Sequence, residues 1–357
     1  MKVTMVGISG SGKTTYMSSL YETLGDAGQN DAGFCLAPRS MQPFDKAILS
    51  IGDFSRFSLA DTFSWPDGTQ QTTVWPFTVF YNSKPVTYFD WIDYRGGILT
   101  EITDIPDSND TSEITKSEIS DLASHIELSN AVILVVDAFV LTYYSNIKEA
   151  RHRSGARRIH EIFTTYSRVY PNRNLTFVIM LTKADTVDSK WKSDNYAPLI
   201  ERGLEVFNQM VSLCKQNPAW QGGIVPVSAV GEGNAKRTVV PTGDVMHPFK
   251  SEDKIIGFPA PLNAEHVLFY CLGQTLKQMK VEAHKSIKQR EKELSEVLKK
   301  AGLVNKIWSL ITRKPDAESI ARAILEEKNK DYEVLSQFEP HIEPLLNKAL
   351  ERVRRIA

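Results

Sequence analysis

Residues 2–15 read KVTMVGISGSGKTT, a strand-like run followed by a glycine-rich loop. The loop fits the pattern G-x-x-x-x-G-K-[ST] over its full length. Glycines allow a tight backbone whose N–H groups point at one anion, and the following helix presents its positive N-terminal end to that anion. We therefore predict a phosphate-binding loop, whose nucleotide-binding residues are Gly7, Ser9, Gly10, Ser11, Gly12, Lys13, Thr14 and Thr15.

Two side chains of this loop have chemical roles of their own. Lys13 is expected to reach the β- and γ-phosphate oxygens, and the Thr14 hydroxyl is expected to ligate Mg²⁺. The alternative is a Gly/Ser-rich turn that ends in Lys-Thr by chance. The strand pattern before the loop and the helical pattern over residues 16–24 after it argue against that alternative.

Composition places the chain among ordinary globular proteins. Of its 357 residues, 42% are hydrophobic and 24% charged, and the formal net charge of −1 gives no pull toward nucleic acid. The three cysteines are far apart, which fits reduced thiols and offers no zinc spacing. The apolar run 131–144 is too short to span a bilayer and contains Asp137. No leader-like segment precedes the first strand, so we expect a cytoplasmic protein. From the charge balance we expect no nucleic-acid partner.

Strand-like and helical patterns alternate along the chain. Two apolar runs across a short turn predict an antiparallel hairpin, and three further apolar runs predict parallel strands; the runs are 74–81, 86–92, 131–138, 175–181 and 224–227. Helices are expected over 16–24, 44–57, 115–128, 159–170, 199–214 and 264–279. The predicted fold is α/β of the P-loop NTPase type, a mostly parallel sheet with one antiparallel edge hairpin and helices on both faces.

The remaining segments between these elements carry turn signals. Residues 29–69 are otherwise irregular, and residues 104–112 are polar enough to predict a mobile loop. Residues 231–260 are punctuated by glycine and proline, so we predict a loop there as well.

The character of the chain changes after Met279, where charged and amphipathic helical patterns begin. We predict a nucleotide-binding domain over 1–280 and a helical C-terminal region over 281–357. Residues 299–314 carry an amphipathic pattern around Trp308 with flanking lysines. Such a segment could lie on an anionic membrane, but packing against protein is the favoured interpretation.

The ends of two predicted strands carry residues suited to a nucleotide site. Asp93 begins the pattern D-x-x-G, which ends at Gly96: the carboxylate can hold Mg²⁺ and the glycine N–H can approach the γ-phosphate. Thr72 or Thr73 could close over Mg²⁺ and the γ-phosphate, and Thr73 is slightly preferred. The expected metal set is thus Thr14, Thr73 and Asp93, and the expected catalytic set is Lys13, Thr73 and Gly96.

The strand over 175–181 is followed by Thr182-Lys183-Ala184-Asp185, which fits [NT]-K-x-D. The Asp185 carboxylate can accept hydrogen bonds from the N1–H and N2 amino group of guanine, whereas adenine offers no such pair of donors. The Lys183 stem can lie along the base. The next strand ends at Ser228-Ala229, whose backbone could contact the guanine O6. A helix N-cap at Asp185 is the simpler structural alternative.

Taken in order, these motifs resemble those of P-loop GTPases. The antiparallel hairpin is similar to that of the translation-factor-related (TRAFAC) class, with its Ras-like, Era-like and dynamin-like members, and the long excursions resemble G domains of bacterial conflict and stress systems. The resemblance covers residues 1–280 and implies switch loops near 69–75 and 93–113. One departure is Gly97, which stands where many members carry a Gln or His that positions water.

Three functions follow from these patterns. The favoured one is a Mg²⁺-dependent, GTP-hydrolysing molecular switch, slow without a protein partner. The second is a nucleotide-dependent scaffold with negligible turnover, which Gly97 favours. An ATPase or nucleotide kinase is the third, and Asp185 argues against it. A dynamin-like membrane role requires membrane contact through 299–314. The sequence leaves the oligomeric state and the regulated process open.

Overall fold

The computed structural model describes residues 1–25, 34–39, 72–93, 122, 124–242, 249–257, 260–300, 336, 340 and 343–356. The chain divides into two units. The first contains residues 1–271 and 347–357, and the second contains residues 272–346. Every residue of the predicted nucleotide site that the structure describes belongs to the first unit.

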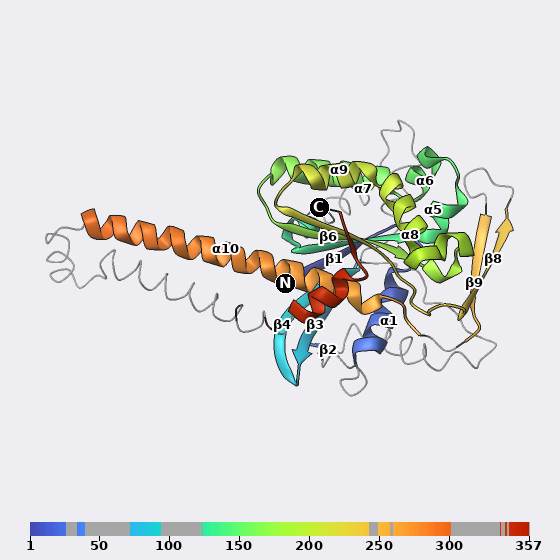
Figure 1. Cartoon of the computed structure of the whole chain (residues 1–357), viewed down its shortest axis with the longest axis horizontal. Coiled ribbons are helices and arrows are strands. Elements are labelled where there is room, and N and C mark those ends of the chain that lie inside the picture. The colour runs from blue at the N-terminus through green and yellow to red at the C-terminus, as the bar shows by residue number, and fades with distance from the viewer. Residues whose placement is uncertain are drawn as a thin grey trace. The chain divides into compact units, whose positions relative to one another are not determined.

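The first unit is built on a sheet of eight described strands in the order β10-β7-β6-β5-β1-β4-β3-β2 (Figure 1). The strands are β1 (Lys2–Val6), β2 (Phe34–Pro38), β3 (Thr73–Tyr81), β4 (Lys84–Asp93), β5 (Ala131–Asp137), β6 (Leu175–Thr182), β7 (Trp220–Pro226) and β10 (Arg354–Arg355). β1 pairs in parallel with β4 and β5, and β5, β6 and β7 continue the parallel arrangement. The predicted α/β fold with a mostly parallel sheet is confirmed.

The central strands are buried because helices cover both faces of the sheet. All residues of β5 and β6 are buried, as expected for nearly continuous apolar runs. On one face lie α1 (Lys13–Gly25) and the first turns of α10 (Ala264–Lys300), joined where the Tyr16 hydroxyl donates to the Ala264 carbonyl at 2.8 Å. The opposite face carries α7 (Ala156–Val169), α8 (Ser189–Val206) and α9 (Asn208–Gln216) (Figure 1). The short helices α5 (Ala138–Tyr143) and α6 (Ile147–Arg153) follow β5.

The edges of the sheet differ in detail from the predicted ones. The hairpin of β3 and β4 is present, but β2 pairs antiparallel with β3 on its outer side, within a region predicted to be irregular. At the opposite edge, β10 pairs antiparallel with β7. There the Ile356 N–H donates to the Gly222 carbonyl at 2.9 Å, and Val353 packs closely against Gly223. The chain therefore returns to the sheet near its C-terminal end.

The loop predicted over 231–260 is the largest error among the described segments. It contains a two-stranded antiparallel ribbon of β8 (Ala235–Pro241) and β9 (Phe249–Ile255). Four of the seven residues of β8 are exposed, and its sequence lacks the apolar alternation that predicts a half-buried strand. The ribbon contacts the one-turn helix η2 (Ala184–Thr186), which belongs to the predicted base motif.

Several predictions lie partly or wholly outside the described residues. These include the helix at 44–57, most of the helix at 115–128, the loop at 104–112 and the amphipathic segment beyond residue 300. α10 continues without a break from 264 to 300, across the predicted boundary near 280, and that boundary stays a prediction. In the part of the chain that the structure describes, no helix has the length and apolar character needed to cross a membrane.

Candidate functional site

The glycine-rich loop connects β1 to α1 and depends on glycine at defined points. Gly10 and Gly12 have φ of +73° and +91°, a region that side chains other than glycine rarely adopt. A β-carbon on Gly7 would clash with the carbonyl of Val135 in β5 and would lie 2.8 Å from the Ser11 hydroxyl. Of the remaining predicted residues, Ser9 is exposed and Thr15 is half-buried. The loop therefore has the tight conformation expected of a phosphate-binding loop.

The Lys13 ammonium group is folded into this loop. Its Nζ donates to the Gly7 carbonyl at 2.9 Å and to the Ile8 carbonyl at 3.1 Å. Burial lowers the pKa of Lys13, and the nearby Asp93 carboxylate acts in the opposite direction. A phosphate group bound in the loop would supply negative charge to this desolvated ammonium.

Two of the predicted metal ligands, Thr73 and Asp93, lie at neighbouring strand ends, and the third, Thr14, lies in the first turn of α1. Thr14 Oγ1 donates to Asp93 Oδ2 at 3.1 Å, and the Asp93 residue is 1% exposed. Thr73 is the register partner of Asp93 across the β3–β4 pair. Hydroxyl and carboxylate oxygens are ligands suited to Mg²⁺, so the residues present fit the predicted ion. Gly96 lies outside the described residues, and among those described no group of three or more His, Cys, Asp or Glu side chains gathers.

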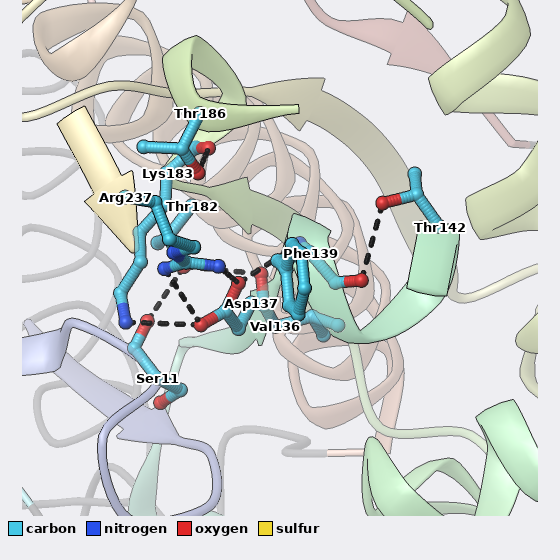
Figure 2. Close-up of polar contacts among 9 residues, drawn as sticks. All are labelled: Ser11, Val136, Asp137, Phe139, Thr142, Thr182, Lys183, Thr186 and Arg237. Carbon is cyan, nitrogen blue, oxygen red and sulfur yellow. Dashed lines mark hydrogen bonds and ion pairs between the residues drawn. The ribbon is translucent and has the colours of Figure 1, made fainter. Parts of the chain in front are cut away.

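Thr182 connects the predicted base motif to the phosphate loop. Its hydroxyl lies 2.6 Å from the Ser11 carbonyl and 3.1 Å from the Val136 carbonyl (Figure 2). The side chain is buried at the end of β6, where Thr182 is the register partner of Asp137 in β5. Two motifs that are far apart in the sequence thus share a direct contact.

Asp185 lies in η2 and is 7% exposed. Its Oδ2 atom is buried and receives no hydrogen bond from the residues that the structure describes. Burial raises the pKa of the Asp185 carboxyl, while hydrogen bonding to Ser228 lowers it. A buried carboxylate oxygen without a donor is suited to a ligand that brings N–H groups.

The segment after β7 is held next to η2. The Ala184 N–H donates to the Val227 carbonyl at 3.1 Å. The Ser228 hydroxyl accepts from the N–H groups of Val230 and Gly231 at 3.2 and 2.7 Å. The Ala229 carbonyl accepts from the Ser19 hydroxyl in α1 at 3.0 Å. The predicted pair Ser228-Ala229 therefore lies between the base motif and the helix that follows the phosphate loop.

Lys183 lies between the two parts of the site. Its φ is +55°, an unusual conformation for a residue other than glycine. Its Nζ forms an ion pair with Asp137 Oδ2 at 2.9 Å, and its Cε would be 3.9 Å from a β-carbon on Gly12. The Lys183 side chain thus runs from the base motif toward the phosphate loop (Figure 2).

Two residues near Lys183 were not predicted as site residues. Asp137, at the end of β5, is the partner of Lys183, and Arg237 of β8 contacts the same carboxylate. Asp137 could have been found, because a carboxylate at the end of a buried parallel strand faces the same edge as the phosphate loop. Arg237 stands in a segment whose sequence predicts only a loop, so nothing in the pattern indicates it.

Comparison with known proteins adds little to this geometry. No family model and no curated protein matches the chain. Among solved structures, a chain of the signal recognition particle receptor SRb–GTP/SRX complex from Chaetomium thermophilum is similar, with 14% identity and a TM-score of 0.32. The match covers 65% of this chain and 95% of that chain. At that TM-score the likeness carries no argument, and function has to be inferred from the residues.

Proposed function

We propose that the protein binds guanine nucleotides with Mg²⁺ and hydrolyses GTP as a molecular switch. The observation that supports this most strongly is the arrangement of Asp185. Its buried Oδ2 lies in the motif whose first residue, Thr182, holds the phosphate loop through Ser11. A nucleotide with its phosphates in that loop would present its base to the Asp185 carboxylate, which selects guanine over adenine.

Different residues would bind the phosphates and the Mg²⁺ ion. The loop N–H groups and the N-terminal end of α1 would bind the phosphates, and Lys13 would neutralise part of their charge. Thr14 and Asp93 would hold Mg²⁺, and Thr73 would join them in the GTP-bound form. The ion, when bound, stabilises the negative charge on the transferring phosphoryl group. The segments near 69–75 and 93–113 would respond to the γ-phosphate.

Hydrolysis is proposed to be slow without a protein partner. Positioning and charge stabilisation account for most phosphoryl-transfer catalysis, and these are the functions of Lys13 and the loop. Gly97 lacks a side chain that could position the attacking water. A partner that supplies this contact would complete the site, as proteins acting on GTPases do.

Calorimetric titration with GDP, a non-hydrolysable GTP analogue and ATP, all with Mg²⁺, tests the assignment. We expect guanine nucleotides to bind and ATP to bind far more weakly. Asp185→Asn should weaken GDP binding by about 100-fold or more, because the carboxylate accepts two hydrogen bonds from the base. The matched control is Asp188→Asn, which alters an exposed carboxylate three residues away.

Xanthosine diphosphate provides a second arm for the same variant. Xanthine carries a carbonyl where guanine carries the amino group, so the side-chain amide introduced by Asp185→Asn can donate a hydrogen bond to it. We expect Asp185→Asn to bind xanthosine diphosphate more tightly than GDP. Equal binding of ATP and GTP by the wild type would reject the guanine assignment in favour of an adenine site.

Phosphate release separates the switch from a scaffold. Steady turnover of GTP by the purified protein would exclude a scaffold with negligible hydrolysis. GTP binding without phosphate release, alone or with candidate partners, would favour the scaffold instead. The proposed membrane alternative is tested by liposome co-sedimentation of wild type against Trp308→Asp, and absence of binding by the wild type removes it.

A further inference from the structure

The Arg237 side chain is buried, although β8 is a strand with several exposed residues. Exposure alternates along β8, and Lys236, Thr238 and Val240 face solvent. The Arg237 side chain between them is only 3% exposed. Burial of a guanidinium group is unfavourable unless the charge is paired. The residues that pair with Arg237 therefore show which part of the protein β8 contacts.

One partner of Arg237 is the Asp137 carboxylate. Arg237 NH1 lies 3.3 Å from Asp137 Oδ1, and NH2 lies 3.4 Å from Oδ2 (Figure 2). The Phe139 N–H also donates to Oδ1 at 2.9 Å, and the guanidinium carbon lies 4.7 Å from the centre of the Phe139 ring. The guanidinium thus contacts both carboxylate oxygens while it packs over an aromatic ring.

The same carboxylate holds Lys183. Oδ2 receives the Lys183 ammonium at 2.9 Å, so Arg237 and Lys183 share one anion. Burial favours a higher pKa for Asp137, yet the two cations and their hydrogen bonds outweigh it and lower the pKa. Arg237 helps to fix the orientation of the carboxylate and to exclude water from it. A carboxylate held in one orientation presents Oδ2 to the Lys183 ammonium in a fixed position.

A second contact attaches the segment before β8 to the same motif. Lys192 Nζ donates to the Asp185 carbonyl and pairs with Glu232 Oε2 at 2.8 Å. Both predicted base-contacting residues, Lys183 and Asp185, are therefore linked to the segment 232–237. β8 also contacts η2, which carries Asp185.

We propose that Arg237 is a positioning residue for guanine binding, through which the β8–β9 ribbon holds the Lys183 side chain in place along the base. This inference rests on the proposed function, because Lys183 contacts a base only if the site takes a nucleotide. Arg237 itself acts through Asp137 and need not touch the ligand. Its removal should weaken base binding and leave phosphate binding unchanged.

Calorimetry with GDP and with pyrophosphate, both with Mg²⁺, tests this on the full-length chain. We expect Arg237→Ala to weaken GDP binding about tenfold, the equivalent of one charged hydrogen-bonded contact. Pyrophosphate affinity should not change, since it reports the phosphate loop alone. Lys236→Ala, which removes an exposed charge from the adjacent position of β8, is the control and should leave both affinities unchanged.

A double-mutant cycle decides whether Arg237 acts through Lys183. In a Lys183→Ala background, Arg237→Ala should cause little further loss of GDP affinity. Additive losses, or an equal loss of pyrophosphate affinity, would overturn the proposal and assign Arg237 a general structural role. Where Arg237→Ala does not fold, Arg237→Lys retains the charge without the planar fork and should show an intermediate loss.

The nucleotide preference of the wild type tests the guanine site separately from the role of Arg237. A wild type that prefers GDP over ADP supports the proposed function, and an unchanged GDP affinity in Arg237→Ala would then overturn only the role of Arg237. A wild type that shows no such preference would reject the guanine site, and with it the role of Arg237.

Discussion

The Thr14 hydroxyl donates a 3.1 Å hydrogen bond to Asp93 Oδ2, which joins the first turn of α1 to the carboxyl end of β4. Two side chains predicted from separate motifs to ligate the same ion are thus adjacent. Because Thr73 is the register partner of Asp93, the start of β3 belongs to this edge as well. The contact places the predicted metal ligands Thr14 and Asp93 next to each other.

We expect Thr14→Val to reduce the dependence of GDP binding on Mg²⁺. The valine keeps the shape of threonine but removes the hydroxyl, and loss of a ligand or of its partner typically lowers metal affinity about 10–100-fold. The measurement is GDP affinity with Mg²⁺ and with chelator. Thr23→Val is the control, because its hydroxyl bonds the Ser19 carbonyl within α1. An unchanged ratio between the two conditions would contradict the assignment of Thr14.

Asp185→Asn should stabilise the ligand-free protein at neutral pH while it weakens guanine binding. Burial raises the pKa of the Asp185 carboxyl, so its ionised form is less favourable in the folded than in the unfolded chain. For such an acid, stability falls as the pH rises from the ordinary carboxyl pKa through the raised folded pKa. Removal of the charge should therefore increase the free energy of unfolding by on the order of 1 kcal/mol.

Urea unfolding of the wild type and of Asp185→Asn between about pH 4 and pH 7 measures this effect. The stability difference should grow with rising pH and level off above the folded pKa. Asp188→Asn, which alters an exposed carboxylate three residues away, is the control. A destabilised Asp185→Asn at neutral pH would indicate that the carboxylate serves the fold instead of a ligand.

Thr182→Val should lower both stability and nucleotide affinity. The substitution leaves the buried shape intact but removes contacts to the Ser11 and Val136 carbonyls. We expect a loss of about 1–3 kcal/mol in the free energy of unfolding, with weaker binding of both GDP and pyrophosphate. Thr142→Val is the control, since its hydroxyl bonds the Phe139 carbonyl within α5. Equal effects of the two variants would show that the Thr182–Ser11 contact has no special role.

Gly12→Ala should weaken phosphate binding without a large steric clash. A β-carbon at this position would make only ordinary van der Waals contacts, with Thr182 at 3.7 Å and Lys183 at 3.9 Å, so backbone conformation at a φ of +91° is the main cost. A left-handed conformation costs a non-glycine residue roughly 1–2 kcal/mol. Pyrophosphate titration measures the consequence, and Gly25→Ala at the end of α1 is the control. Unaltered pyrophosphate binding by Gly12→Ala would show that the loop conformation is not required.

The sequence predicted those parts of the fold that local patterns specify. β5 and β6 are nearly continuous apolar runs, and the Gly-x-x-x-x-Gly-Lys-Thr pattern needs only the residues it contains. The contacts Thr14–Asp93 and Thr182–Ser11 agree with the predicted grouping of motifs, because the ends of parallel strands meet at one edge. The roles of these residues in binding and catalysis stay predictions.

Elements that depend on distant partners could not be read from the sequence. β2 contains only five residues and forms through pairing with β3, and β10 contains only two. β8 is held partly by one buried arginine whose partner lies 100 residues earlier, whereas the glycines and prolines around the strand predict a loop. Lys183–Asp137–Arg237 is a tertiary cluster, and no spacing within one segment encodes it.

The pairing of β10 with β7 also determines when the sheet can be completed during synthesis. β10 is synthesised after α10 and the whole second unit. The outer edge of β7 therefore stays unpaired until the ribosome has translated all of these residues. Unpaired edges are templates for intermolecular pairing, and contacts of high sequence separation form slowly. A nascent chain or a truncated product that ends before residue 343 would therefore expose β7 and be prone to aggregation, even with the nucleotide site already translated.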